Sequence, residues 1–225
     1  MQHVAHEALR RFKNRSLSPV DLMEATIRRA EALKTSINAF TYCHFDEAMD
    51  LARTAEAKYA RGARTGALEG LPIGIKDESE IKGKPTSSGS LIMKDYVATQ
   101  TSTVNGRVIA AGGIVHARTA TPEFSCAGTT WSRLWGVTRN PWNTKFTCGG
   151  SSGGAAASLA AFATPAFAQE NPAAADDDSG GIEEIIVTAQ KREQNLQDVP
   201  VAVTAFSAAT IAASVSDVAA LTEAR

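Results

Sequence analysis

Two stretches of the sequence place chemically useful residues where the chain is expected to turn sharply. The first is residues 71–77, LPIGIKD, an apolar run that predicts a short buried strand ending at Lys76. One interpretation of Lys76 is a solvated surface residue at a strand end. The other is a lysine that burial holds near neutrality, so that its amine can move protons.

The second stretch is residues 149–154, GGSSGG, which precedes an Ala-rich run. One interpretation is a flexible linker. The other is a tight loop that presents the hydroxyls of Ser151 and Ser152, with backbone N–H groups, at a helix N-terminus where negative charge is favoured. A phosphate-binding P-loop is excluded because the Gly-Lys-Ser/Thr ending is absent.

Helices are expected to fill residues 1–60. Residues 18–21, SPVD, combine a Ser N-cap, a Pro at the first helical position and an acid in the first turn. A further helix is expected over 46–59, ending at Gly62, with an inner stripe of Met49, Ala52, Ala55 or Glu56, and Tyr59.

An α/β layer is expected after residue 66. A helix over 103–111 is closed by two glycines and followed by a strand over 114–117, an order typical of α/β folds. Residues 119–150 are expected to be mostly loop, and a loop of that length in a compact domain is usually either functional or wrongly assigned.

The composition is that of an ordinary globular protein. The 225 residues are 44% hydrophobic and 21% charged, which excludes a wholly disordered, collagen-like or coiled-coil chain. The formal net charge of −1 gives no indication of nucleic-acid binding. This total hides a split, because residues 1–160 carry a net charge of +6 and residues 161–225 one of −7, which suggests two segments of different origin.

No cofactor or metal site is predicted. Cys43, Cys126 and Cys148 are an odd number without a close pair, which fits neither a disulfide framework nor a zinc site. His3 and His6 could share a helix face as ligands, or simply be solvated histidines of a first helix. Because no stretch reaches about 18 apolar residues and no secretory signal starts the chain, we expect no membrane span and a cytoplasmic location.

With their flanks, the two stretches resemble the amidase signature family. The resemblance covers about residues 5–160 and is specific, because several separate motifs occur in the family's order. It implies an α/β, truncated amidase-signature fold with N-terminal helices and part of a mixed sheet. The matching segments are 70–77 GLPIGIKD, 83–90 GKPTSSGS, 110–113 AAGG, 121–124 TPEF, 135–142 WGVTRNPW and 149–155 GGSSGGA.

The resemblance implies hydrolysis of a small amide substrate by a Ser–cis-Ser–Lys triad. Lys76 matches the family's catalytic lysine, and Ser151 matches the bridging serine of the cis peptide bond. A neutral lysine takes a proton through the bridging serine from a nucleophilic serine, which attacks the amide carbonyl. The relay then protonates the leaving amine.

The nucleophile that the resemblance requires is not at its expected place. In the family it lies roughly two dozen residues after the bridging serine, and counting that far from Ser151 reaches Ala175. Ser179 is the nearest serine, but it precedes its glycines instead of following them. The family's large C-terminal portion is also missing, so we expect the chain to be inactive. The alternative is a miniature amidase with Ser152 or Ser179 as nucleophile.

The last part of the sequence resembles a different family. Residues 155–169 are similar to the end of a bacterial signal peptide, with a cleavage site after Ala168. Residues 183–192, EEIIVTAQKR, resemble the energy-coupling box of TonB-dependent outer-membrane receptors, and 198–206 resemble the start of their plug domain. The implied partner of residues 183–190 is a TonB-like protein that pairs with them as an added strand.

Three segments are therefore expected: a partial amidase-signature domain over 1–160, a signal-peptide-like end and spacer over 161–182, and a receptor fragment over 183–225. The join lies between about Gly154 and Ala168. The tail is expected to be largely disordered, with a weak strand near 185–188 and a short helix near 208–218. Two other interpretations are a non-enzymatic interaction protein and a scaffold with no site.

Overall fold

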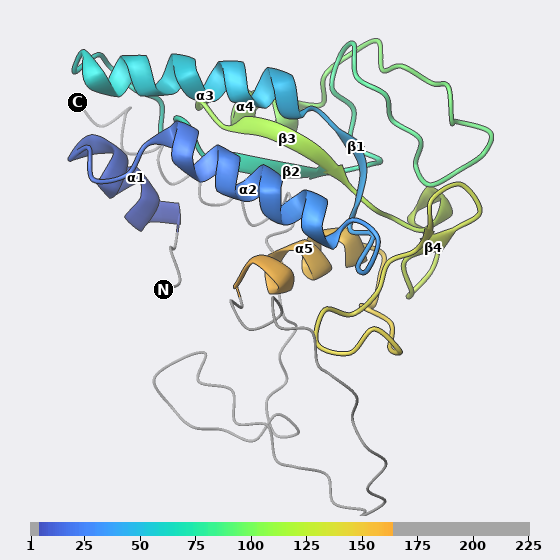
Figure 1. Ribbon diagram of the computed structural model, residues 1–225. Helices are drawn as coiled ribbons and strands as arrows, with labels where there is room; N and C mark the ends of the chain where they lie inside the picture. The colour runs from blue at the N-terminus through green and yellow to red at the C-terminus, as the bar shows by residue number, and fades with distance from the viewer. Residues whose placement is uncertain (1–4, 164–225) are drawn as a thin grey trace, which may run out of the picture. The chain divides into compact units, whose positions relative to one another are not determined.

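The computed structural model describes residues 5–163, and Figure 1 shows its helices and strands. The strand and helix expected in the tail lie outside the described residues. The elements are α1 (Ala5–Lys13), α2 (Pro19–Leu33), β1 (Phe40–Cys43), α3 (Phe45–Ala60), β2 (Pro72–Lys76), α4 (Thr103–Ala110), β3 (Ile114–Thr119), the 3₁₀ turn η1 (Glu123–Ser125), β4 (Trp131–Ser132), β5 (Gly136–Val137) and α5 (Gly153–Ala163).

A mixed three-stranded sheet organises the described residues. Its strand order is β1-β3-β2, with β2 parallel and β1 antiparallel to β3. Because β2 and β3 are parallel, α4 lies in the connection between them, and Lys76 at the end of β2 pairs with Thr119 at the end of β3. The α/β class and the mixed sheet expected from the sequence are confirmed.

Helices cover the sheet on both sides in the view of Figure 1, where α3 lies above the sheet and α5 below it. One core cluster joins Met23 of α2, Ala48 and Ala52 of α3, and Ile114 of β3. The alanines let α3 approach both neighbours closely, and each is fully buried. Arg29 of α2 donates two hydrogen bonds to the Ala161 carbonyl, at 3.1 and 2.9 Å, and so attaches the last turn of α5 to α2.

The predicted start of α2 is confirmed in detail. The Ser18 hydroxyl accepts hydrogen bonds from the backbone N–H groups of Val20 and Asp21, and Pro19 is the first helical residue. The helix predicted over 46–59 is α3, one residue longer at each end. Its buried stripe is Ala48, Ala52, Ala55 and Tyr59, whereas Met49 is half-buried and Glu56 is exposed.

Two short elements were not expected. β1 interrupts the region that was predicted to be helical, because its sequence FTYC is β-branched and aromatic and finds a pairing partner in β3. The hairpin β4–β5 lies in the stretch predicted as loop, where Trp131 pairs with Val137. In both cases a tertiary or cross-strand partner, rather than local periodicity, selects the strand.

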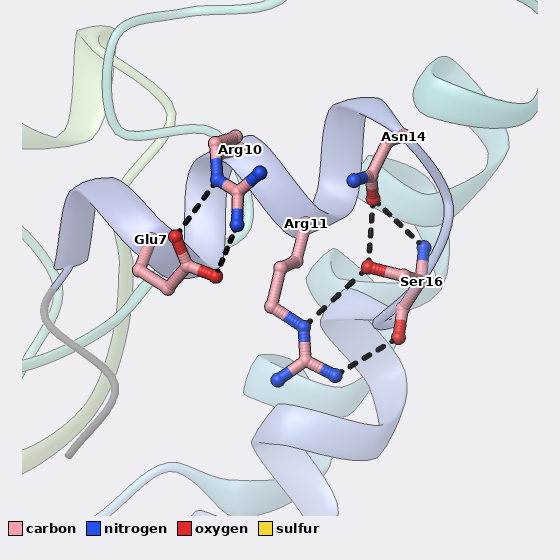
Figure 2. A network of polar contacts seen from close by, with 5 residues as sticks. All are labelled: Glu7, Arg10, Arg11, Asn14 and Ser16. Carbon is pink, nitrogen blue, oxygen red and sulfur yellow. Dashed lines mark hydrogen bonds and ion pairs between the residues drawn. The ribbon is translucent and has the colours of Figure 1, made fainter. Parts of the chain in front are cut away.

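The first helix presents a solvated polar network at its surface, shown in Figure 2. Arg10 contacts both carboxylate oxygens of Glu7, at 2.8 and 2.7 Å. Arg11 donates to the hydroxyl and the carbonyl of Ser16, whose hydroxyl donates to Asn14. These groups are exposed, so the network orders the turn after α1 but adds little to the stability of the fold.

The N-terminus of α5 lies against the chain just after β3. The backbone N–H of Gly154 donates to the Ala120 carbonyl at 3.1 Å. A Cβ atom at Gly154 would overlap the backbone of Ala120 and would lie 2.6 Å from the Ala39 carbonyl oxygen. Gly154 therefore has to be a glycine for α5 to begin at this place.

We predict that Gly154→Ala destabilises the protein by about 1–3 kcal/mol, because the added methyl group meets backbone that cannot move aside. Gly106→Ala in α4 is the matched control. Its Cβ would meet nothing closer than 3.9 Å, so better helix propensity should leave stability unchanged or raise it by up to about 1 kcal/mol. Urea unfolding followed by circular dichroism measures both, and equal stability of the two variants would contradict the proposed packing.

His116 of β3 is buried without a hydrogen-bond partner for its Nδ1 in residues 5–163. Its ring packs edge-on against Phe40. Burial, with a smaller contribution from the nearby His44, lowers the pKa of His116 to about 4. The folded protein therefore binds this proton less readily than the unfolded chain, whose histidines have pKa values near 6.5.

Stability contributed by a neutral His116 is fully present above about pH 6.5 and is lost as the pH falls toward 4. We expect this residue to lower the free energy of unfolding by about 2 kcal/mol between pH 7 and pH 5. Urea titrations at both pH values should show a smaller decrease for His116→Leu than for the unchanged protein. His6→Gln, an exposed substitution, should retain the full decrease; an unaltered decrease in His116→Leu would refute the assignment.

Candidate active site

The structure brings Lys76 and Ser151 together. The Lys76 Nζ atom donates to Ser151 Oγ at 2.8 Å, although 75 residues separate the two in sequence. Lys76 is the last residue of β2, and Ser151 lies in the turn that leads into α5. The peptide bond between Gly150 and Ser151 is cis. The two residues named from the sequence thus form one contact, while their catalytic roles stay a prediction.

Residues 149–154 form a tight, packed turn, so the flexible-linker interpretation is wrong. Gly149 has a φ of +79°, a conformation that favours glycine. A Cβ at Gly150 would lie 2.8 Å from the backbone nitrogen of Thr129. Thr130 closes the turn, because its hydroxyl donates to the Gly149 carbonyl at 2.9 Å and accepts from the Gly153 N–H at 3.0 Å.

Lys76 has a second partner that the sequence analysis did not identify. The Nζ atom lies 3.3 Å from Glu78 Oε1, in an ion pair whose lysine is 18% and whose glutamate is 40% exposed. The hydroxyl of Ser125 donates to the other oxygen of Glu78. Strand periodicity does not predict this contact, because β2 ends at Lys76 and the chain turns there, with the Ser79 N–H donating to the Lys76 carbonyl at 3.1 Å.

A buried carboxylate next to Lys76 fixes the end of β2. Asp77 is fully buried, and its oxygens accept from the backbone N–H of Ser87 at 3.0 Å and from the Ser87 hydroxyl. Trp135 Nε1 donates to the same hydroxyl at 2.8 Å. Burial raises the pKa of Asp77, while the hydrogen bonds from Ser87 oppose that increase. The motifs around 77, 87 and 135 therefore meet in one polar network.

The side chain of Arg118, in β3, contacts the backbone at the end of β2. The Arg118 side chain is fully buried, and Nη2 donates to the carbonyls of Lys76 and Ser79, at 3.1 and 2.6 Å. Burial lowers the pKa of Arg118, and the Asp77 carboxylate opposes that decrease. A guanidinium stays charged in proteins, so Arg118 balances the buried Asp77 while it fixes the position of Lys76.

In the described residues, no further serine hydroxyl hydrogen-bonds to Lys76 or Ser151. Within residues 5–163, the Ser151 hydroxyl has Lys76 as its one hydrogen-bond partner. Ser152 is half-buried and makes no hydrogen bond to Ser151. Ser179, the other candidate named from the sequence, lies outside the described residues. The pair can pass a proton between a hydroxyl and an amine, and it needs a further hydroxyl to attack a carbonyl.

No metal centre is built by the part of the chain that the structure describes, where no three His, Cys, Asp or Glu side chains gather. His6 is an exposed residue of α1, and His3 lies outside the described range. Cys43, Cys126 and Cys148 are all free thiols. Between residues 5 and 163 no helix combines the length and apolar character needed to span a bilayer.

Comparison with curated proteins finds many relatives with amide chemistry in their names. The chain is 38% identical to an indoleacetamide hydrolase of Bradyrhizobium diazoefficiens over 150 residues, which is 67% of this chain and 29% of the relative. It is 37% identical to a glutamyl-tRNA(Gln) amidotransferase subunit of Rhodopirellula baltica over 165 residues, 73% of this chain and 33% of the relative. The chain therefore spans about a third of these relatives' length.

Solved structures give the same result for the fold. A bacterial aryl acylamidase of the amidase signature family matches with a TM-score of 0.65 and 33% identity, over 68% of this chain and 32% of the acylamidase. A 6-aminohexanoate cyclic dimer hydrolase matches with a TM-score of 0.63 and 33% identity, over 73% and 33% of the two chains. The amidase family model matches residues 21–167. On the agreement of sequence, fold and family model, the chain belongs to the amidase signature family.

Proposed function

We propose that this chain carries the lysine and bridging-serine half of an amide-hydrolysing relay. The observation that supports it most directly is the 2.8 Å hydrogen bond from Lys76 Nζ to Ser151 Oγ. Supporting it further, both side chains lie on well-fixed backbone, at the end of a paired strand and in a turn without spare space.

In this proposal Lys76 is the base and Ser151 conducts the proton. A neutral Lys76 amine accepts the Ser151 proton while Ser151 Oγ takes the proton of a nucleophilic serine. That serine forms a bond to the amide carbonyl carbon, and the carbon–nitrogen bond then breaks, which leaves an acyl ester on the serine. The proton returns by the same path to the leaving amine. Water, which gives its proton to the same relay, then attacks the ester and releases the carboxylic acid and the free serine, so Lys76 and Ser151 end in their starting states.

The nucleophile is the part of the relay that this chain does not supply in our proposal. The sequence has Ala175 where the family pattern calls for a serine. The chain also spans only about a third of the relatives it matches. Two members of a triad that acts as a unit give almost no turnover without the third, so we infer that the chain alone does not hydrolyse amides.

The substrate class we propose is a small carboxamide. The names of the relatives share an amide, as an indoleacetamide in one and an acylamide in another. No side chain that would choose among such amides is identified in residues 5–163. A cytoplasmic location, as expected from the sequence, belongs to the same proposal.

For residues 161–225 we propose a joined receptor fragment, which rests on the sequence resemblances of residues 155–169, 183–192 and 198–206 alone. The amidase family model ends at residue 167, close to the proposed join. A pull-down of a purified TonB-like protein by the full chain, with residues 183–190 replaced by Gly-Ser as control, tests the hypothesis. Equal capture of both chains, or of neither, would exclude the box as a binding segment.

The activity prediction is that the purified chain shows no turnover of indole-3-acetamide or 4-nitroacetanilide above that of Lys76→Ala. Ammonia or nitroaniline release at pH 7 to 9 measures it. The physical reason is that no activated hydroxyl is placed to attack the carbonyl. Ser151→Ala serves as a second control for background turnover.

A fluorophosphonate probe that labels activated serines provides an independent test. Mass spectrometry should find no serine whose labelling depends on Lys76. Labelling of Ser152 or Ser179 that disappears in Lys76→Ala, together with turnover of either amide, would refute the inactive assignment and establish that serine as the nucleophile.

A further inference from the structure

The hairpin β4–β5 exposes apolar side chains on the face where an antiparallel pair usually carries polar ones. Trp131 of β4 pairs with Val137 of β5, and the side chains of both are about half exposed. The next residue along each strand, Ser132 and Thr138, is buried. Because side chains alternate between the two faces of a strand, the hairpin buries its hydroxyl groups and exposes its apolar groups. Such a face is typical of an interaction surface.

The loop after β5 adds two more exposed rings next to the hairpin. The loop is closed by an isolated antiparallel bridge between Arg139 and Thr147, and Figure 1 shows it in yellow, outside the three-stranded sheet. Trp142 and Phe146 lie in this loop and are 63% and 65% exposed. The backbone N–H of Asn140 donates to the Phe146 carbonyl at 3.2 Å, so the rings lie on a hydrogen-bonded loop. We call Trp131, Val137, Trp142 and Phe146 the aromatic face.

Cations accompany the aromatic face, and no carboxylate occurs in the same part of the sequence. Between residues 124 and 163 the only charged residues are Arg133, Arg139 and Lys145, and all three are exposed. The buried side of β5 packs on uncharged backbone, where the Thr138 hydroxyl donates to the Asn38 carbonyl at 2.8 Å. The charge of this surface is therefore complementary to an anionic partner that also accepts apolar rings.

We propose that the aromatic face, with its three cations, binds the surface of an anionic lipid bilayer. Aromatic rings partition into the boundary between headgroups and acyl chains, where a Trp ring keeps its N–H group in the polar layer. Each Lys or Arg near an anionic leaflet strengthens binding about fivefold, so three cations give about a hundredfold. This interaction is separate from the proposed relay and does not require Lys76 or Ser151.

A single-stranded nucleic acid would also meet rings and cations, but the balance of groups favours a bilayer. Strong, salt-dependent nucleic-acid binding uses about six to ten phosphate contacts, and this segment offers three cations. Val137 has no ring on which a base could stack, whereas its side chain adds to the apolar area that a bilayer removes from water. The surface is thus richer in apolar groups than in charge.

The first test is flotation of the full chain with unilamellar vesicles. Vesicles of equimolar phosphatidylcholine and phosphatidylglycerol should bind the protein at least about tenfold more tightly than pure phosphatidylcholine. Raising the NaCl concentration from about 0.1 M to about 1 M shortens the screening length from about 10 Å to about 3 Å. This change should remove most of the preference for the anionic vesicles.

Paired substitutions identify the surface. Trp142→Ser with Phe146→Ser should weaken binding to the anionic vesicles at least about tenfold, because two rings no longer leave water. Arg133→Gln with Lys145→Gln should weaken it about 25-fold, at about fivefold for each cation, and should leave binding to pure phosphatidylcholine unchanged.

A matched control removes one apolar group and one cation elsewhere. Ile92 is 84% exposed and Lys82 is exposed, and both lie outside residues 124–163. Ile92→Ser with Lys82→Gln should therefore keep the vesicle binding of the unchanged protein. Circular dichroism establishes that each variant retains the fold.

A second test needs no loss of binding. Acyl chains that carry bromine quench the fluorescence of tryptophans that reach them. Trp131 and Trp142 should be quenched in brominated anionic vesicles. Trp135 should not, because its Nε1 donates to Ser87 and its ring packs edge-on against Tyr42. Trp131→Phe with Trp142→Phe should therefore bind as before and lose the quenching.

Four outcomes would overturn the proposal. They are equal binding to the two kinds of vesicle, an equal loss in the Ile92 control, vesicle binding without quenching, and no binding to vesicles. A labelled single-stranded oligouridine is tested in parallel by fluorescence anisotropy. Binding of this RNA without binding to vesicles would assign the aromatic face to nucleic acid and refute the assignment to lipid.

Discussion

The hydrogen bond between Lys76 and Ser151 is the contact on which the arrangement of the site depends. It joins the end of β2 to the turn before α5, across 75 residues of sequence. Neither side chain can reach the other unless both backbones are held in place. The parallel pairing with β3 fixes the first, and the close approach of Gly154 to Ala120 fixes the second.

Charged groups around Lys76 offset the cost of placing an amine near the core. A positive amine near the core would be costly if it were alone. Here Glu78 balances it at the surface, while the fully buried Asp77 and Arg118 balance one another behind it. The carbonyl of Lys76 accepts from Arg118, so the backbone and the side chain of one residue are held by groups of opposite charge.

Much of the fold could be predicted from local patterns, and the site could be predicted in part. The Ser18 cap and the helical stripe of α3 carry their signals within a few residues; the cap is confirmed, and so is the stripe at Ala52, Ala55 and Tyr59. The pairing of Lys76 with Ser151 came from motif resemblance, since spacing along the chain contains no information about it. Strand β1 was missed because its pairing with the distant β3 defines it. The partner Glu78 was missed because the turn after β2, and no sequence period, brings its carboxylate to Lys76.

The parallel pairing of β2 with β3 has a consequence for the order in which the chain folds. Pro72 pairs with Ile114 only after the intervening segment with α4 has been closed into a loop. Closing this loop lowers the entropy of the chain before the stabilising contacts between the strands form. The adjacent helices α2 and α3 need no such closure and are suited to nucleate first. Since α5 packs on backbone that follows β3, the contact between Lys76 and Ser151 forms only when β2, β3 and α5 are all in place.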